Sequence, residues 1–214
     1  MTRLDPTQTE IATLLFSLPE AAGYALAGGA ALLAAGTIDR PTRDLDAFIA
    51  ATPTQPPGDV TTLAATLIET LEANGWTVTI VRRHQTFHRL NAARHDDWVE
   101  IDLAVDSPRL FPTTTIDGIP MLDPRDLAAR KILAILDRAE GRDFTDLEAL
   151  QRDHPSTAII DWARQLDPGL AHTDIARAFE QLERLDDSEL PTADPAATRR
   201  LFDEWADELQ KAGL

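Results

Sequence analysis

The sequence predicts an α+β protein in which a mixed sheet with flanking helices is followed by a bundle of helices. Three observations support this prediction. Short runs of alternating apolar and polar residues recur between positions 24 and 106, as is typical of half-buried strands. From Pro124 onward the apolar residues follow only a helical period. The 214 residues, 43% of them hydrophobic, can bury a sizeable core. We expect two domains, residues 1–122 and 123–214.

Turn residues and changes of period delimit the expected elements. In the front half these are a helix at 7–18, a strand, helix and strand within 24–50, a loop at 53–58, a helix at 59–74 and strands at 76–83, 86–94 and 98–106. In the back half they are helices at 124–140, 142–153, 156–166, 172–185 and 195–212.

Composition excludes several classes of protein. The chain has no cysteine, so disulfide frameworks, cysteine-ligated zinc and thiol nucleophiles are excluded. A net charge of −16 argues against nonspecific wrapping of nucleic acid. No uncharged apolar run reaches about 18 residues and the N-terminus lacks the pattern of a signal peptide. We therefore expect a cytoplasmic protein without a membrane partner.

Two acids stand at alternate positions in Asp44-Leu45-Asp46. In a strand, successive side chains point to opposite faces, so both acids share one face while Leu45 faces the core. Two carboxylates this close repel each other unless a cation intervenes, and hard oxygen ligands suit Mg²⁺ or Mn²⁺. The pattern predicts a divalent-cation site, and the alternative interpretation is the solvent face of an edge strand.

Two glycines, Gly28 and Gly29, end an apolar strand and open a helix of small residues. Glycines at such a turn let backbone N–H groups approach a phosphate, and the partial positive charge of a helix N-terminus favours an anion. A tight turn or close helix packing requires the same residues, so that alternative stays open. Combined with the two acids, the glycines suggest nucleotidyl transfer.

A third acid follows the same pattern. Apolar and acidic residues alternate over 99–103, which places Glu100 and Asp102 on the polar face of a strand. We predict that Asp102 is a metal ligand together with Asp44 and Asp46. Such a set could hold two cations, one that lowers the pKa of an attacking hydroxyl and one that neutralises a triphosphate.

Arginines concentrate where acids are missing. No Asp or Glu occurs between Ala73 and His95, and the segment contains three of the five histidines, without metal-ligand spacing, so zinc is not expected. We expect its four arginines to face a triphosphate or a nucleic-acid backbone: Arg82, Arg83, Arg89 and Arg94. The tryptophans are expected to anchor the core: Trp76, Trp98, Trp162 and Trp205.

These motifs, in this order, resemble the AbiEii/MenT-like nucleotidyltransferases, toxins of bacterial toxin–antitoxin pairs with a DNA polymerase β-like fold. Four ordered motifs between residues 24 and 150 are much more specific than any one of them. The family's glycine motif appears as Gly28 to Leu32, its Arg-x-Thr-x-Asp-Leu-Asp motif as Arg40 to Asp46, its Ile-Asp-Leu strand as Ile101 to Leu103, and its lysine-bearing helix followed by Arg-Asp-x-x-Asp-Leu as Lys131 and Arg142 to Leu147.

The resemblance implies a nucleotidyltransferase fold and Mg²⁺-dependent (or Mn²⁺-dependent) transfer of nucleotides from an NTP to the 3′ end of tRNA. This addition would release pyrophosphate and block translation, and a cognate antitoxin would be the protein partner. On this basis we assign the nucleotide contacts to Gly28, Gly29, Arg40, Thr42 and Lys131.

The chain has only two lysines, Lys131 and Lys211, and its other permanently cationic side chains are arginines. A compact ammonium suits a phosphate contact and could offset charge as pyrophosphate leaves. The alternative is a solvated lysine on a helix. The resemblance also implies that Asp143 or Asp146, which share a helix face, organises the site, with helix capping as the alternative.

One departure from the family pattern concerns Ala30 and Ala31, which follow the glycines where the family usually has a hydroxyl residue first. We expect weaker or altered triphosphate binding, and a noncatalytic nucleotide-binding protein is one alternative. Transfer onto a protein or small molecule is another, favoured by the acidic composition.

Overall fold

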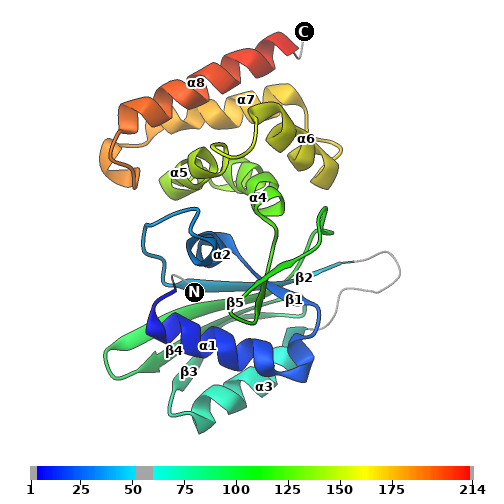
Figure 1. Cartoon of the computed structure of the whole chain (residues 1–214), viewed down its shortest axis with the longest axis vertical. Coiled ribbons are helices and arrows are strands. Elements are labelled where there is room, and N and C mark those ends of the chain that lie inside the picture. The colour runs from blue at the N-terminus through cyan, green and yellow to red at the C-terminus, as the bar shows by residue number, and fades with distance from the viewer. Residues whose placement is uncertain (1–3, 52–59, 213–214) are drawn as a thin grey trace. The chain divides into compact units, whose positions relative to one another are not determined.

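The computed structural model describes residues 4–51 and 60–212, so the loop predicted at 53–58 lies outside the described residues. The chain divides into two compact units, Met1–Asp123 and Pro124–Leu214 (Figure 1). Within the described residues, no helix is long and apolar enough to cross a membrane.

The first unit is built on a seven-stranded mixed sheet with strand order β3-β4-β5-β2-β1-β7-β6. β2 pairs with β5 and β1 with β7 in parallel, and the other neighbouring strands are antiparallel. The strands are β1 (Tyr24–Ala27), β2 (Asp44–Ala50), β3 (Thr77–His84), β4 (Phe87–Arg94), β5 (Asp97–Asp106), β6 (Thr114–Ile116) and β7 (Ile119–Met121).

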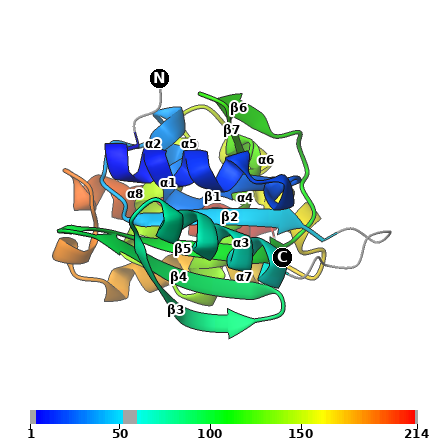
Figure 2. The same ribbon diagram turned by 90° about the horizontal axis from the view of Figure 1, so that it is seen from below.

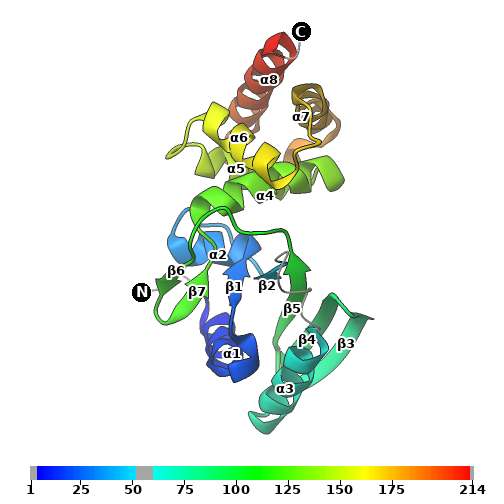
Figure 3. The ribbon, with the colours of Figure 1, turned by 90° about the vertical axis from the view of Figure 1, so that its right-hand side faces the viewer.

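Helices cover both faces of this sheet. Helices α1 (Pro6–Ser17) and α3 (Val60–Ala73) lie on one face (Figure 2), and α2 (Gly28–Ala35) lies on the other (Figure 3). Asp5 starts α1, because its carboxylate accepts from the backbone N–H of Gln8 at 2.7 Å while the Gln8 side chain reaches back, as in a capping box. Helix α3 ends where Gly75 adopts a φ of +83°.

Over residues 124–212, the described part of the second unit, all regular secondary structure is helical, as predicted. Its core holds an aromatic cluster in which the Phe202 ring lies 5.1 Å from both Phe144 and Phe179 and 5.7 Å from Trp205. The helices are α4 (Pro124–Asp137), α5 (Gly141–Leu150), α6 (Ser156–Leu166), α7 (His172–Phe179) and α8 (Pro195–Ala212), with 3₁₀ turns at Glu180–Arg184 and Asp187–Glu189.

Two elements differ from the sequence-based expectation. Sequence patterns predict no strand between residue 106 and Pro124, yet β6 and β7 form a hairpin there. Its turn residues, Asp117 and Gly118, have φ of 50° and 83°. Positive φ at both central positions is typical of a type I′ turn, for which Asp-Gly is a favoured pair. The helix expected at 172–185 continues beyond Phe179 only as a 3₁₀ turn.

Candidate active site

The register of β2 and β5 brings four acids together on one face of the sheet. Asp46 is the direct partner of Asp102, and Asp44 is the direct partner of Glu100. Adjacent strands lie about 4.8 Å apart, so these carboxylates are neighbours both along and across the strands. We call these four residues the carboxylate array. The expected alternation holds, since Leu45 between the two β2 acids is fully buried.

Gly28 lets Asp46 approach the start of α2. Its φ is +58°, and a Cβ at Gly28 would lie 1.8 Å from Oδ2 of Asp46, so the carboxylate occupies the space of the missing side chain. A Cβ at Gly29 would lie 3.1 Å from Nη2 of Arg40 and 3.3 Å from Oγ1 of Thr42. The structure therefore gathers all of these predicted residues at one helix start.

A hydrogen bond from a side chain of α1 holds the backbone of the segment that carries Thr42. Gln8, only 1% exposed, donates from Nε2 to the Thr42 carbonyl at 2.9 Å. Helix α2 begins after Ala27, whose side chain has no oxygen to cap it. The first-turn N–H groups of a helix lack partners within it and attract anions, as a phosphate-binding turn requires. Ala30 and Ala31 are buried in the core.

Asp102 has a protein partner. Arg89 on β4 is its direct neighbour across the sheet and donates from Nε to Oδ1 at 2.9 Å and from Nη2 to Oδ2 at 2.7 Å. Arg89 also lies 3.2 Å from the Glu100 carboxylate through Nη1. The hydrogen bonds to Asp102, with the charges of Asp102, Glu100 and Asp46, raise the pKa of Arg89 above its usual value.

The three predicted metal ligands lie on neighbouring strands, and Asp102 is bound by Arg89. Within residues 4–51 and 60–212, no three His, Asp or Glu side chains are grouped closely enough to hold a metal ion. Both oxygens of Asp102 accept hydrogen bonds from Arg89. The donor chemistry still fits Mg²⁺ or Mn²⁺, because Asp44 and Asp46 offer hard oxygens on one strand face beside the glycine turn.

Lys131, in the second unit, is buried, so the solvated-lysine alternative is wrong. Its Nζ lies 3.0 Å from Asp143 Oδ1 and 2.6 Å from Asp146 Oδ2, and both acids are completely buried. Arg138 adds two hydrogen bonds to Asp143, at 2.9 and 3.0 Å. Burial acts to raise the pKa of Asp143, but the hydrogen bond from Arg138 and the charge of Lys131 outweigh it, so that pKa is lowered.

The four arginines of the acid-free segment lie in different surroundings. Arg82 and Arg83 are exposed on β3, at the edge of the sheet, whereas Arg89 binds the array. Arg94 donates to Glu10 Oε1 at 2.8 Å, and its Cζ lies 4.1 Å from the centre of the Trp76 ring. Two of the four arginines are therefore engaged within the first unit.

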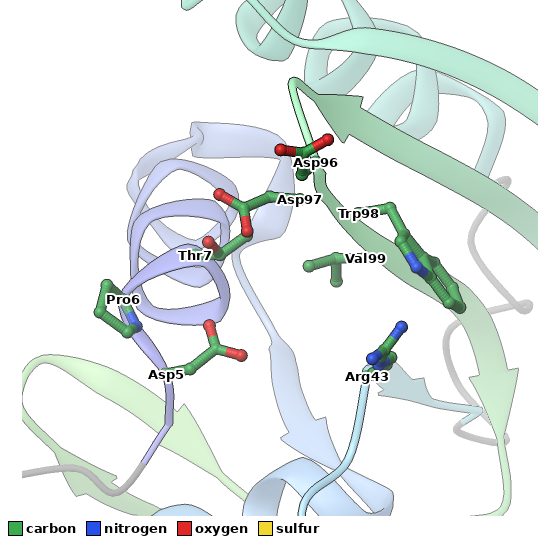
Figure 4. Close-up of a pocket in the computed structure, with 8 residues that line it drawn as sticks. All are labelled: Asp5, Pro6, Thr7, Arg43, Asp96, Asp97, Trp98 and Val99. Atoms are coloured by element: carbon green, nitrogen blue, oxygen red, sulfur yellow. The ribbon is translucent and has the colours of Figure 1, made fainter.

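A cavity of about 440 Å³ opens where β5 begins (Figure 4). Trp98 borders it, 44% exposed, with the Arg43 guanidinium 5.3 Å from its ring centre. The expectation that Trp98 anchors the core is wrong, although Trp76 and Trp205 are buried as expected. Trp98 has the same alternation parity as Asp102, which places it on the polar face. The remaining lining residues are Asp5, Pro6, Thr7, Asp96, Asp97 and Val99.

Solved structures share this fold. JHP933 from Helicobacter pylori superposes with a TM-score of 0.59 at 15% identity, covering 98% of this chain and 94% of that one. A second H. pylori protein, described as a "putative nucleotidyltransferase", gives 0.58 at 14% identity, with 98% and 97% covered. The antibiotic-resistance factor ANT(2'')-Ia gives 0.54 at 12% identity, with 77% and 94% covered. No curated protein matches the sequence.

A family profile shows which protein family the chain belongs to. The profile described as "Nucleotidyl transferase AbiEii toxin, Type IV TA system" matches residues 13–212, which include both units. This match confirms the family resemblance, and the shared fold confirms the predicted fold class. The chain therefore belongs to the AbiEii nucleotidyl transferase toxin family and is a nucleotidyltransferase.

Proposed function

We propose that this protein transfers nucleotides from an NTP to the 3′ end of tRNA, releases pyrophosphate and thereby blocks translation. The observation that carries the chemical part is the contact of the Asp46 carboxylate with Gly28 at the start of α2. There a cation-binding acid and a phosphate-binding turn lie side by side, which is the arrangement that activation of a triphosphate requires. Family membership supports the toxin role.

Asp44 and Asp46 are the proposed ligands of Mg²⁺ or Mn²⁺, and Asp102 would join them when its oxygens are shared with Arg89. A divalent cation bound there would polarise the triphosphate and neutralise developing charge. The backbone N–H groups at Gly28 and Gly29, with Arg40 and Thr42, orient the phosphates.

Lys131 is the proposed cation for the departing pyrophosphate. An ammonium has three N–H donors, and its described carboxylate partners, Asp143 and Asp146, use two of them. Both acids therefore hold Lys131 in a fixed position. We propose that Asp143 and Asp146 together position Lys131 for the reaction. Their proposed contribution is positional, because neither acid has an exposed side chain.

The acceptor is proposed to be tRNA because Arg82 and Arg83 expose positive charge on the β3 edge of a protein that is otherwise strongly acidic. Phosphate contacts of this kind lose affinity steeply as salt rises. The net charge of −16 instead favours the alternative, transfer to a protein or small molecule, for which activity would depend little on salt. A cognate antitoxin is the proposed protein partner, in keeping with the family.

The test is incubation of the purified chain with Mg²⁺, total tRNA and each labelled NTP in turn, resolved on a denaturing gel. Asp46→Asn is the inactive control, and Asp39→Asn, at an exposed acid just before Arg40, is the matched control. Label on tRNA that disappears only in Asp46→Asn supports the proposal.

Pyrophosphate release without label on tRNA would instead support a protein or small-molecule acceptor. Binding of Mg²⁺-NTP without any pyrophosphate release would support the noncatalytic alternative, which Ala30 and Ala31 suggested.

A further inference from the structure

Arg89 brings a positive charge directly into the carboxylate array. Its guanidinium binds both oxygens of Asp102, at 2.9 and 2.7 Å, and reaches Glu100 at 3.2 Å. A fork that binds a carboxylate through two parallel hydrogen bonds is the strong form of this interaction. The contact therefore occupies the very oxygens that a third metal ligand would present.

The sheet order fixes this arrangement. Arg89 pairs with Asp102 across β4 and β5, and Asp102 pairs with Asp46 across β5 and β2. Three neighbouring strands thus place one guanidinium in a row with two carboxylates. Acids this close repel one another, and a nearby cation relieves that repulsion.

We infer that Arg89 is a resident counter-cation of the carboxylate array: it holds Asp102 in place without a metal ion and lowers the affinity of the array for a divalent cation. The inference rests on the proposed function, because it takes the array as the cation site. A divalent ion must either share Asp102 with Arg89 or bind beside a fixed positive charge. Arg89 is thus a positioning residue that tunes cation binding.

The test measures Mn²⁺ binding to the full-length chain by electron paramagnetic resonance, without nucleotide. Arg89→Gln should bind Mn²⁺ on the order of tenfold more tightly than the wild type, the size expected when a unit charge a few ångströms from a divalent ion is removed from a partly solvated site. Its unfolding temperature should be lower without Mn²⁺ and should rise more on addition of Mn²⁺, because binding stabilises the folded state.

Arg94→Gln is the matched control. Arg94 lies on the same strand and also binds a carboxylate, that of Glu10, but outside the array. This variant should lose stability without any change in Mn²⁺ affinity. Arg89→Lys keeps the charge without the fork, so its Mn²⁺ affinity should stay within about threefold of the wild type.

The possible results of these Mn²⁺ measurements either support or overturn the role of Arg89. A folded Arg89→Gln that binds Mn²⁺ no more tightly than Arg94→Gln overturns the inference and leaves the proposed function standing. Absence of Mn²⁺ binding in both the wild type and Arg89→Gln overturns the cation site itself, whereas binding in Arg89→Gln alone supports the inference. If Arg89→Gln folds only when Mn²⁺ is added, the inference is supported, and if it folds at no Mn²⁺ concentration the inference is overturned.

Discussion

Substitution of Gly28 by Ala tests the contact between the glycine turn and Asp46. The added Cβ would lie 1.8 Å from Oδ2 of Asp46, and the φ of +58° is one that L side chains adopt only with strain. The left-handed conformation costs about 1 kcal/mol, and overpacking of this kind adds about 1–3 kcal/mol. Reduced entropy of the unfolded chain returns about 0.4–1 kcal/mol, so we expect a net destabilisation of about 2 kcal/mol.

The effect on activity should be larger than the effect on stability. The Asp46 carboxylate must move by about 1 Å or more to make room, and a misplacement of that size costs on the order of 100-fold in rate. The assay is pyrophosphate release with Mg²⁺ and NTP, accompanied by urea unfolding of the same samples. At temperatures where the variant remains folded, the loss of activity is attributable to the site.

Gly29→Ala is the internal control for this prediction. Its Cβ would meet the flexible end of Arg40 at 3.1 Å, which can shift, and alanine is favoured over glycine within a helix by about 0.5–1 kcal/mol. We expect its stability to be unchanged or slightly raised. Equal activity and equal stability of the two variants would show that the close approach of Gly28 to Asp46 has no consequence for the fold or the site.

Three further predictions concern the second unit. Asp143→Asn leaves Arg138 without its buried counter-charge and leaves Lys131 with Asp146 alone, so it should destabilise the protein by about 3 kcal/mol in urea unfolding. Because the pKa of Asp143 is lowered on folding, its contribution to stability should be fully present above the unfolded value of about 3.9 and lost as pH falls through the lower folded pKa, as measured by unfolding against pH. Phe202→Ala removes the ring in contact with three aromatic partners and should cost about 3–5 kcal/mol.

For each of these three predictions, one measured result would contradict it. An Asp143→Asn variant as stable as the wild type at neutral pH would mean that the ion pairs of Asp143 with Lys131 and Arg138 make no net contribution to stability. Acid unfolding at the same pH in wild type and variant would remove Asp143 from the pH dependence. A loss below about 1 kcal/mol in Phe202→Ala, far less than a well-packed core phenylalanine costs, would show that the aromatic cluster is loosely packed.

Local patterns predicted the fold class and the position of the acids. Alternation of apolar and acidic residues fixed which side chains of β2 and β5 share a face, because the period of a strand is two. The same alternation places Trp98 on the polar face with Asp102, so the period of the strand predicts its exposure. The Asp117-Gly118 pair was a signal for the β6–β7 hairpin, and the strands beside it were too short to show alternation.

The pairing of Arg89 with Asp102 could also have been predicted from the sequence. A two-residue turn at His95 and Asp96 pairs Arg94 with Asp97, and five further steps along each strand pair Arg89 with Asp102. What local patterns could not give is the approach of Gly28 to Asp46, which depends on how α2 packs on the sheet. The burial of Lys131 likewise depends on the packing of α4 against α5.

We propose that Asp46, which lies against Gly28, is part of a divalent-cation site that activates an NTP. The most direct test of this proposal compares Mn²⁺ binding and pyrophosphate release in the wild type and in Asp46→Asn, a variant of equal size without the charge. We expect that the variant stays folded, binds Mn²⁺ much more weakly and releases no pyrophosphate. An Asp46→Asn protein that binds Mn²⁺ and releases pyrophosphate as the wild type does would contradict it.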